Sequence, residues 1–144
     1  MHRHVRLACL ALVVLAIAAF EPFEIAGAAD SPPEGRLFEL RIYTANDGKL
    51  ADLHKRFREH TNRLFVKHGM TLVGYWTPTD GPEAANTLVY MLAYPDRAQR
   101  DKSWKDFMAD PEWQAAYKAS HAAGPLVKKV ESKFLNPTDY SPIK

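Results

Sequence analysis

The stretch LFELRIYT, residues 37–44, decides the fold of this chain, because polar and apolar side chains alternate along it. A period of two is typical of a β-strand, whose successive side chains point to opposite faces of a sheet. We expect three apolar side chains to face the helices of the domain: Phe38, Leu40 and Ile42. Arg41 and Tyr43 are then predicted to lie on the sheet face that is turned away from the helices.

Outward from this strand, helical and strand patterns alternate. Residues 50–68 repeat apolar side chains at helical spacing, and their charged residues, Arg56 among them, are expected on the helix surface. A second helical region covers residues 96–123. The expected helix caps are Asn46 or Asp47 for the first region and Asp96 and Asp110 for the second. Further strands are predicted at residues 70–77, 87–94 and 126–135.

This order of elements is β-α-β-β-α-β, the ferredoxin-like α+β arrangement. It places four antiparallel strands in one sheet with both helices on one face, in a domain at residues 37–136 followed by an irregular tail at 137–144. The strand at 87–94 is almost entirely apolar, which favours a central position. The other sheet face would expose apolar area, so we expect a second copy of the chain to cover it in a two-fold homodimer.

Residues 1–29 have the pattern of a secretory signal peptide. Two arginines precede a continuous apolar run at residues 7–20, and small residues follow it. Cleavage near Ala28 or Ala29 would leave a flexible leader at residues 30–36 and export the protein to the periplasm or the medium. The alternative is a retained membrane anchor, but the run is shorter than the roughly 18 residues of a spanning helix. We therefore expect no membrane span after cleavage.

Short motifs spread over residues 37–142 resemble those of the NIPSNAP family. In chain order they are FELRIY (38–43), EHT (59–61), KHG (67–69), LVGYW (72–76), DGP (80–82), AYP (93–95), DPEW (110–113) and ES (131–132). The resemblance implies a dimeric α+β barrel, in which two ferredoxin-like sheets close face to face, and it implies little chemistry. Related sequences often carry a His and a Trp in the third strand, where this chain has Tyr90 and Leu92.

The predicted site is the sheet face turned away from the helices. Arg41 and Tyr43 would lie there with one member of the aromatic pair 75–76, since neighbours on a strand point to opposite faces. The candidate ligand-binding residues are Arg41, Tyr43, Trp76, Tyr90, Tyr94 and His60. A guanidinium among phenols suits a small aromatic or carboxylate ligand. The alternative is structural: Arg41 would pair with Glu39 or Glu131 and close the dimer.

The chain offers no pattern for the common catalytic chemistries. His54, His60 and His68 are six and eight residues apart, which does not suit a shared metal site on one helix. The single cysteine, Cys9, lies in the predicted signal peptide, so thiol catalysis and disulfides are not expected. We predict no catalytic residue, no metal and no cofactor. The 19 basic and 17 acidic residues are interspersed, which argues against nucleic-acid binding.

One histidine of the first helical region has two open interpretations. His60 follows Phe57 by three residues on the inward stripe of its helix, as a core-edge histidine or a functional one. Trp104, Trp113 and Tyr117 are interpreted as core.

The first functional hypothesis is an exported homodimer that binds a small molecule or a protein partner. The alternative, from fold analogy, is a cofactor-independent monooxygenase or a haem-degrading enzyme.

Overall fold

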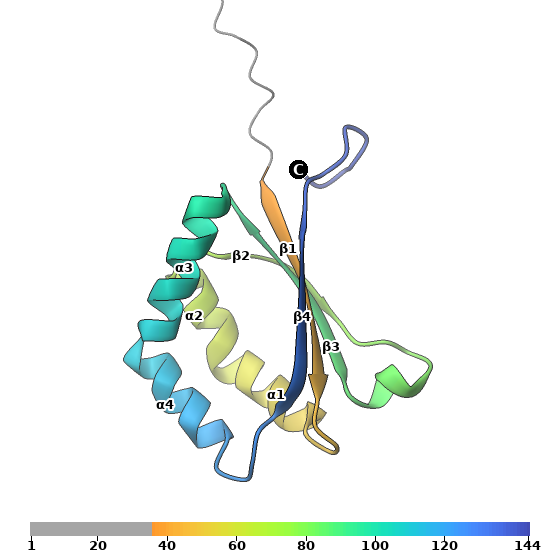
Figure 1. The fold of residues 1–144 in the computed structure, drawn as a ribbon, viewed down its shortest axis with the longest axis vertical. Coiled ribbons are helices and arrows are strands. Elements are labelled where there is room, and N and C mark those ends of the chain that lie inside the picture. The colour runs from red at the N-terminus through yellow and green to blue at the C-terminus, as the bar shows by residue number, and fades with distance from the viewer. Residues whose placement is uncertain (1–35) are drawn as a thin grey trace, which may run out of the picture. The chain divides into compact units, whose positions relative to one another are not determined.

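Residues 36–144, which the computed structural model describes, form a four-stranded antiparallel sheet with helices packed on one face (Figure 1). The strands are β1 (Leu37–Ala45), β2 (Thr71–Trp76), β3 (Thr87–Tyr94) and β4 (Val127–Leu135). Their order is β2-β3-β1-β4, so β3 and β1 lie inside and β2 and β4 form the edges. The predicted ferredoxin-like fold and the inner position of the third strand are confirmed. The predicted signal peptide lies outside the described residues, as does the leader apart from Arg36.

The first helical region contains a π turn. α1 (Leu50–Arg56) continues through the π-helix η1 (Phe57–Thr61) into α2 (Asn62–Lys67), and Gly69 at φ 79° ends the region. A left-handed residue suits a helix C-terminus, and glycine adopts that conformation without a steric penalty. The remaining helices are the 3₁₀ turn η2 (Pro82–Ala85), α3 (Arg97–Ala109) and α4 (Pro111–Ser120).

Two predicted helix caps are confirmed and one is wrong. Asp96 and Asp110 each accept a hydrogen bond from a backbone N–H in the first turn of α3 and α4, at 2.7 and 2.8 Å. Neither Asn46 nor Asp47 caps α1, which has no side-chain cap among the described residues. Asn46 instead donates its side-chain amide to the carbonyl oxygen of Pro125 at 2.8 Å. This bond ties the turn after β1 to the start of β4.

The two faces of β1 are the reverse of the prediction. The ring of Tyr43 meets that of Phe57 on η1 edge-on, 6.1 Å between centroids, so Tyr43, Arg41 and Glu39 face the helices. The open face carries the apolar set that was expected in the core: Phe38, Leu40 and Ile42. The reason is that the polar groups of Glu39, Arg41 and Tyr43 hydrogen-bond to one another, which offsets the free-energy cost of burying them. Apolar character alone therefore did not identify the helix-facing side.

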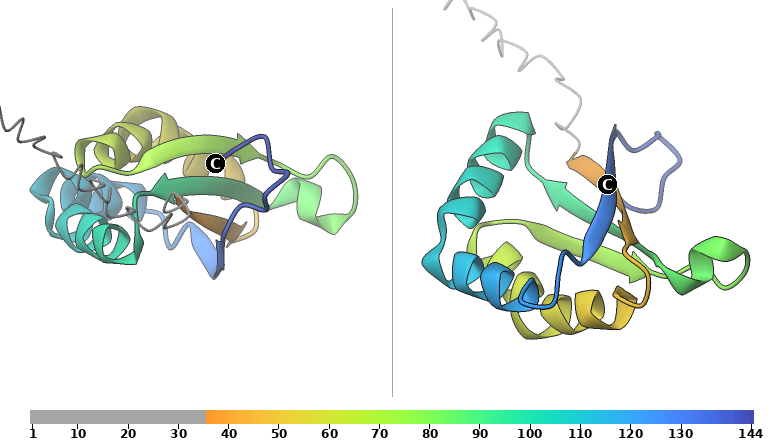
Figure 2. Two further views of the ribbon diagram at one scale, coloured as in Figure 1. Left: turned by 90° about the horizontal axis from the view of Figure 1, so that it is seen from above. Right: turned by 60° about the horizontal axis from the view of Figure 1, so that its bottom comes forward.

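The hydrophobic core lies between the sheet and the helices. Alternate residues of β3 point into it and pack against the first helical region: Leu88, Tyr90, Leu92 and Tyr94. Val89 and Met91 occupy the open face and are half-buried. Figure 2 shows the helices gathered on one side, while the β2–β3 connection with η2 projects beyond the sheet. Within residues 36–144 no helix has the length and apolar character that crossing a membrane requires.

Candidate functional site

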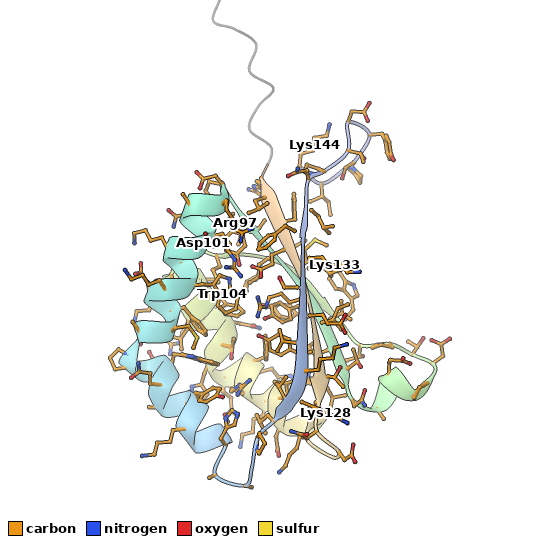
Figure 3. The ribbon with its side chains drawn as sticks, viewed as in Figure 1. Arg97, Asp101, Trp104, Lys128, Lys133 and Lys144 are labelled. Carbon is orange, nitrogen blue, oxygen red and sulfur yellow. The ribbon has the colours of Figure 1, made fainter. Side chains whose placement is uncertain are left out.

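A cavity of about 350 Å³ lies between the sheet and the helices. Strands β1 and β4 line one side, and the two helical regions line the other. Trp104 of α3 lies on the helix side of β4, whereas Lys133 lies on its far side (Figure 3). The aromatic lining residues are Tyr43, Phe57, Phe65, Trp104, Phe107, Trp113 and Tyr117. A concave, largely apolar space with a few polar groups is the usual form of a small-molecule site.

Glu39 anchors a polar network on the helix-facing side of β1. Its side chain is fully buried, and it accepts hydrogen bonds from Arg41 at 2.5 Å and from Arg100 at 2.7 and 2.9 Å. The other donors are the Ser132 and Tyr94 hydroxyls and the Trp104 indole, at 2.7, 3.0 and 3.2 Å. The network therefore links β1 to β3, β4 and α3.

These donors keep Glu39 ionised. Burial opposes its ionisation, but the hydrogen bonds from Arg100 and the charge of Arg41 outweigh burial and lower its pKa to about 2. Of the structural alternative for Arg41, the pairing is observed, with Glu39 as the partner, while its role in closing a dimer stays a prediction. The pairing is wrong for Glu131, which lies on the open face and pairs with Lys129 at 2.6 Å.

Arg56 is a second buried arginine beside the cavity, and it has no acidic partner among the described residues. One terminal nitrogen, Nη1, donates to the Ser120 hydroxyl at 3.2 Å. The guanidinium lies over the Trp113 and Tyr117 rings, 5.3 and 5.6 Å from their centroids. Its Nε is buried without a hydrogen-bond partner in this part of the chain. Burial lowers the pKa of Arg56, although a guanidinium remains charged at neutral pH.

Two buried phenols beside this region also lack hydrogen-bond partners within residues 36–144, those of Tyr75 and Tyr90. Their rings stack 5.6 Å apart at 16°, and Tyr43 meets Tyr90 edge-on at 5.2 Å. Burial raises the pKa of both phenols, so both are neutral at physiological pH. Buried groups without partners are uncommon in native proteins. Tyr75 lines a separate hollow, and Tyr90 packs against Tyr43 of the cavity wall.

The structure brings together three of the six predicted site residues. Arg41 and Tyr43 line the cavity, and Tyr90 packs directly against Tyr43. Tyr94 belongs to the network around Glu39. All four lie on the helix-facing side of the sheet, so their predicted position on the open face is wrong.

Trp76 and His60 lie away from this cavity. Trp76 is on the open face of β2 and is 52% exposed. His60 is half-exposed, with Glu59 4.0 Å away, and lines a separate hollow between α1 and α4. The π turn explains its displacement, because a wider turn places Thr61 rather than His60 on the inward face. The predicted inward position of His60 is therefore wrong.

Of the lining residues, only Arg41 and Tyr43 were assigned to the site from the sequence; those missed include Arg56, Trp104, Trp113 and Tyr117. Trp113 belongs to the hydrophobic core and Trp104 packs against it, whereas Tyr117 is 46% exposed, so its interpretation as core is wrong. All three also form walls of the cavity. Arg56 was expected on the surface because it is charged. Its spacing was the available signal, since it follows Leu53 by three residues and precedes Phe57, and both of these are buried.

The cavity lining contains basic side chains and no acidic ones among the described residues. Arg41, Arg56, Lys128 and His121 contribute to it, and none of the described lining residues is an Asp or Glu. Within residues 36–144, no three His, Cys, Asp or Glu side chains come close enough to share a metal ion. The arrangement can hold a molecule with an apolar body and a negatively charged group.

A ferredoxin-like sheet covered by helices on one face has the protomer fold of the dimeric α+β barrels. The model of the NIPSNAP family matches residues 38–142, and the chain therefore belongs to the NIPSNAP family. The resemblance seen in the sequence is confirmed.

Solved bacterial structures share this fold. A NIPSNAP family protein of unknown function from Agrobacterium tumefaciens superposes with a TM-score of 0.67 at 24% identity, over 77% of this chain and 96% of that one. A NIPSNAP domain protein from Burkholderia xenovorans gives 0.63 at 29% identity, over 74% and 98%. SnoaB, a cofactor-independent oxygenase from Streptomyces nogalater, gives 0.50 at 15% identity, over 75% and 98%. No curated protein matches the chain.

Proposed function

We propose that this NIPSNAP protein binds a small molecule in the cavity between its sheet and its helices. The observation that carries the proposal is a cavity walled by aromatic rings, with Arg41 and Arg56 in its lining and no acid among the described lining residues. A bound molecule with a negatively charged group would pair with Arg56 and fill the apolar space. The role is one of binding, and the protein acts after export from the cytoplasm.

The proposed assembly is a homodimer that closes through the open sheet faces. Four half-buried side chains, none of them charged, lie at the centre of this face: Leu40, Ile42, Val89 and Met91. Covering such a surface contributes about 25 cal/mol for each Å² of apolar area removed from water. In this arrangement the cavity lies on the other side of the sheet, so ligand binding and dimer formation use different faces.

Obstruction of the cavity tests the binding proposal. Val130 lines the cavity from the edge strand β4 and is 47% exposed, so Val130→Trp can narrow the space without opening the core. Molecules that co-purify with the wild type are identified by mass spectrometry after native purification. We expect the variant to lose them while its far-UV circular dichroism stays unchanged.

A matched control is Val66→Trp on α2, where Val66 is 59% exposed and does not line the cavity. This variant should retain whatever the wild type carries. Equal retention by both variants would contradict the location of the site. Oxygen uptake with quinol-type substrates would point instead to a cofactor-independent oxygenase, the alternative that the fold shared with SnoaB supports.

A further inference from the structure

We infer that the ligand is an aromatic monocarboxylate and that Arg56 is the residue that binds its carboxylate. This inference rests on the proposed function and names the class of molecule that the cavity accepts. It depends on three features: the missing counter-ion of Arg56, the available end of its guanidinium, and the aromatic walls beside it.

The first feature is the difference between the two arginines of the cavity. Arg41 donates to the buried carboxylate of Glu39 at 2.5 Å, so its charge is balanced within the chain. Arg56 is only 5% exposed and makes no ion pair among the described residues; the cavity lining holds no acid, and Asp52 and Glu59 line a separate hollow with Arg56. A buried charge without a counter-ion is unfavourable. An anion in the cavity would supply the missing charge.

The second feature is the part of the Arg56 guanidinium that is available. Nη1 is engaged with the Ser120 hydroxyl at 3.2 Å. Nε is buried and does not reach the cavity surface, whereas Nη2 makes no hydrogen bond to any residue in 36–144. Nη1 and Nη2 form the end of the planar fork, whose spacing matches the two oxygens of a carboxylate. The geometry therefore favours a carboxylate over a single-oxygen anion.

The third feature is the wall against which Arg56 packs. Trp113 lies under the guanidinium and against Phe107, with 4.4 Å between the two ring centroids. Tyr117 continues the wall at 5.6 Å from Trp113. A planar ring beside these side chains can adopt the tilted and edge-on contacts that aromatic groups prefer. A volume of about 350 Å³ lies at the small end of ligand pockets, which suits a body of one or two rings.

The test measures calorimetric binding of three probes to the purified protein: 1-naphthoate, its neutral analogue 1-naphthalenemethanol, and the aliphatic acid decanoate. We expect naphthoate to bind about tenfold or more tightly than either of the others. Only naphthoate has both a carboxylate for the Arg56 guanidinium and an aromatic ring for the cavity walls. Arg56→Met should remove the preference for naphthoate over the alcohol. Arg56→Lys, which keeps the charge but loses the fork, should retain part of that preference.

Arg58→Met is the matched control, since Arg58 is exposed on the same helical region and does not line the cavity. It should bind all three probes like the wild type. Thermal melting separates recognition from folding: Arg56→Met should keep or raise the melting temperature, because it removes an uncompensated buried charge. A large fall in melting temperature would make Arg56 structural and overturn the inference.

The outcomes distinguish this inference from the proposed function. Equal wild-type affinity for naphthoate and the alcohol would overturn carboxylate recognition but leave cavity binding intact. Tighter binding of decanoate would overturn the aromatic part. If the wild type binds none of the three probes and carries no co-purified molecule, the proposed function itself fails.

Discussion

At the scale of single residues, Glu39 shows how a buried carboxylate can organise a domain. It lies on an inner strand, is fully buried, and accepts hydrogen bonds from side chains of β1, β3, β4 and α3. The charge of Arg41 or Arg100 would be unfavourable in this place without it. Removing the carboxylate charge leaves these two cations without their shared counter-ion, so we expect the folded protein to lose stability.

Glu39→Gln should destabilise the protein by about 3–5 kcal/mol, because a buried ion pair loses one partner while the other remains. Urea unfolding followed by circular dichroism measures the change. Ser132→Ala is the milder comparison, since it removes one hydrogen bond to the same carboxylate and should cost about 1–3 kcal/mol. A Glu39→Gln protein as stable as the wild type would show that the network is not required for folding.

The same residue predicts an acid-sensitive stability. The pKa of Glu39 is lowered from 4.5 to about 2 in the folded protein. A lowered folded-state pKa stabilises the protein above the unfolded value, and that stabilisation is lost as the pH falls from about 4.5 towards 2. This lowering of the pKa corresponds to about 3 kcal/mol of stability at pH above the unfolded value. Free energies of unfolding measured across this range should fall steeply for the wild type and less steeply for Glu39→Gln.

At the scale of elements, the π turn η1 and the cap residue Asp110 position the helices around the cavity. The π turn brings Thr61 to the inner face, where its hydroxyl donates to the carbonyl oxygen of Arg56 at 3.3 Å. Asp110 begins α4 and also accepts hydrogen bonds from Lys67 and His68 at the end of the first helical region, both at 2.7 Å. One carboxylate therefore fixes the start of α4 against the end of α2.

Asp110→Ala should lower the melting temperature more than Asp96→Ala does. The side chain of Asp96 makes only the capping hydrogen bond among the described residues, and the loss of an aspartate cap costs about 1 kcal/mol. Asp110 has the cap and two further side-chain partners, Lys67 and His68, so its removal breaks the link between α2 and α4 as well. Differential scanning calorimetry of the two variants provides the comparison. Equal shifts would mean that the contacts with Lys67 and His68 contribute nothing to stability.

At the scale of the whole molecule, helices cover one face of the sheet and the other face carries aliphatic side chains. Leu40 on β1 is opposite Met91 on β3 at the centre of that open face. A second protomer would cover it by symmetric packing of the two sheets. The proposed dimer and the proposed export of the mature chain each lead to a measurement.

Met91→Glu should convert the proposed dimer into monomers, because the introduced charge would be buried between two apolar sheets. Light scattering at micromolar concentration should give twice the protomer mass for the wild type and the single mass for the variant. The control is Val66→Glu on the exposed surface of α2, which should remain dimeric. A folded wild-type monomer at that concentration would contradict the proposed assembly.

Expression in a bacterial host with its own secretion machinery should release a protein that begins at Ala29 or Asp30. The basic and apolar pattern of residues 1–29 is the reason for this expectation. The intact mass of the protein from the periplasmic fraction checks it. A membrane-bound protein whose mass includes residues 1–28 would contradict export by cleavage.

The sequence by itself determined the order of the elements, most of their bounds and the family. Alternation of period two, helical spacing, aspartate caps and glycine stops act over a few residues, so they can be recognised without tertiary contacts. The strand at residues 87–94 was predicted with the bounds that β3 has, and its apolar composition correctly placed it inside the sheet.

Only the tertiary structure decided which face of β1 meets the helices, and with it the location of the candidate site. Residues 37–44 offer two faces, and either could have been covered. The choice depended on whether Glu39 and Arg41 could find partners inside, and those partners come from α3 and β4, about 60 and 90 residues further along the chain. For the same reason Arg56 looked like a surface residue, because the rings of Trp113 and Tyr117 that cover it come from another helix.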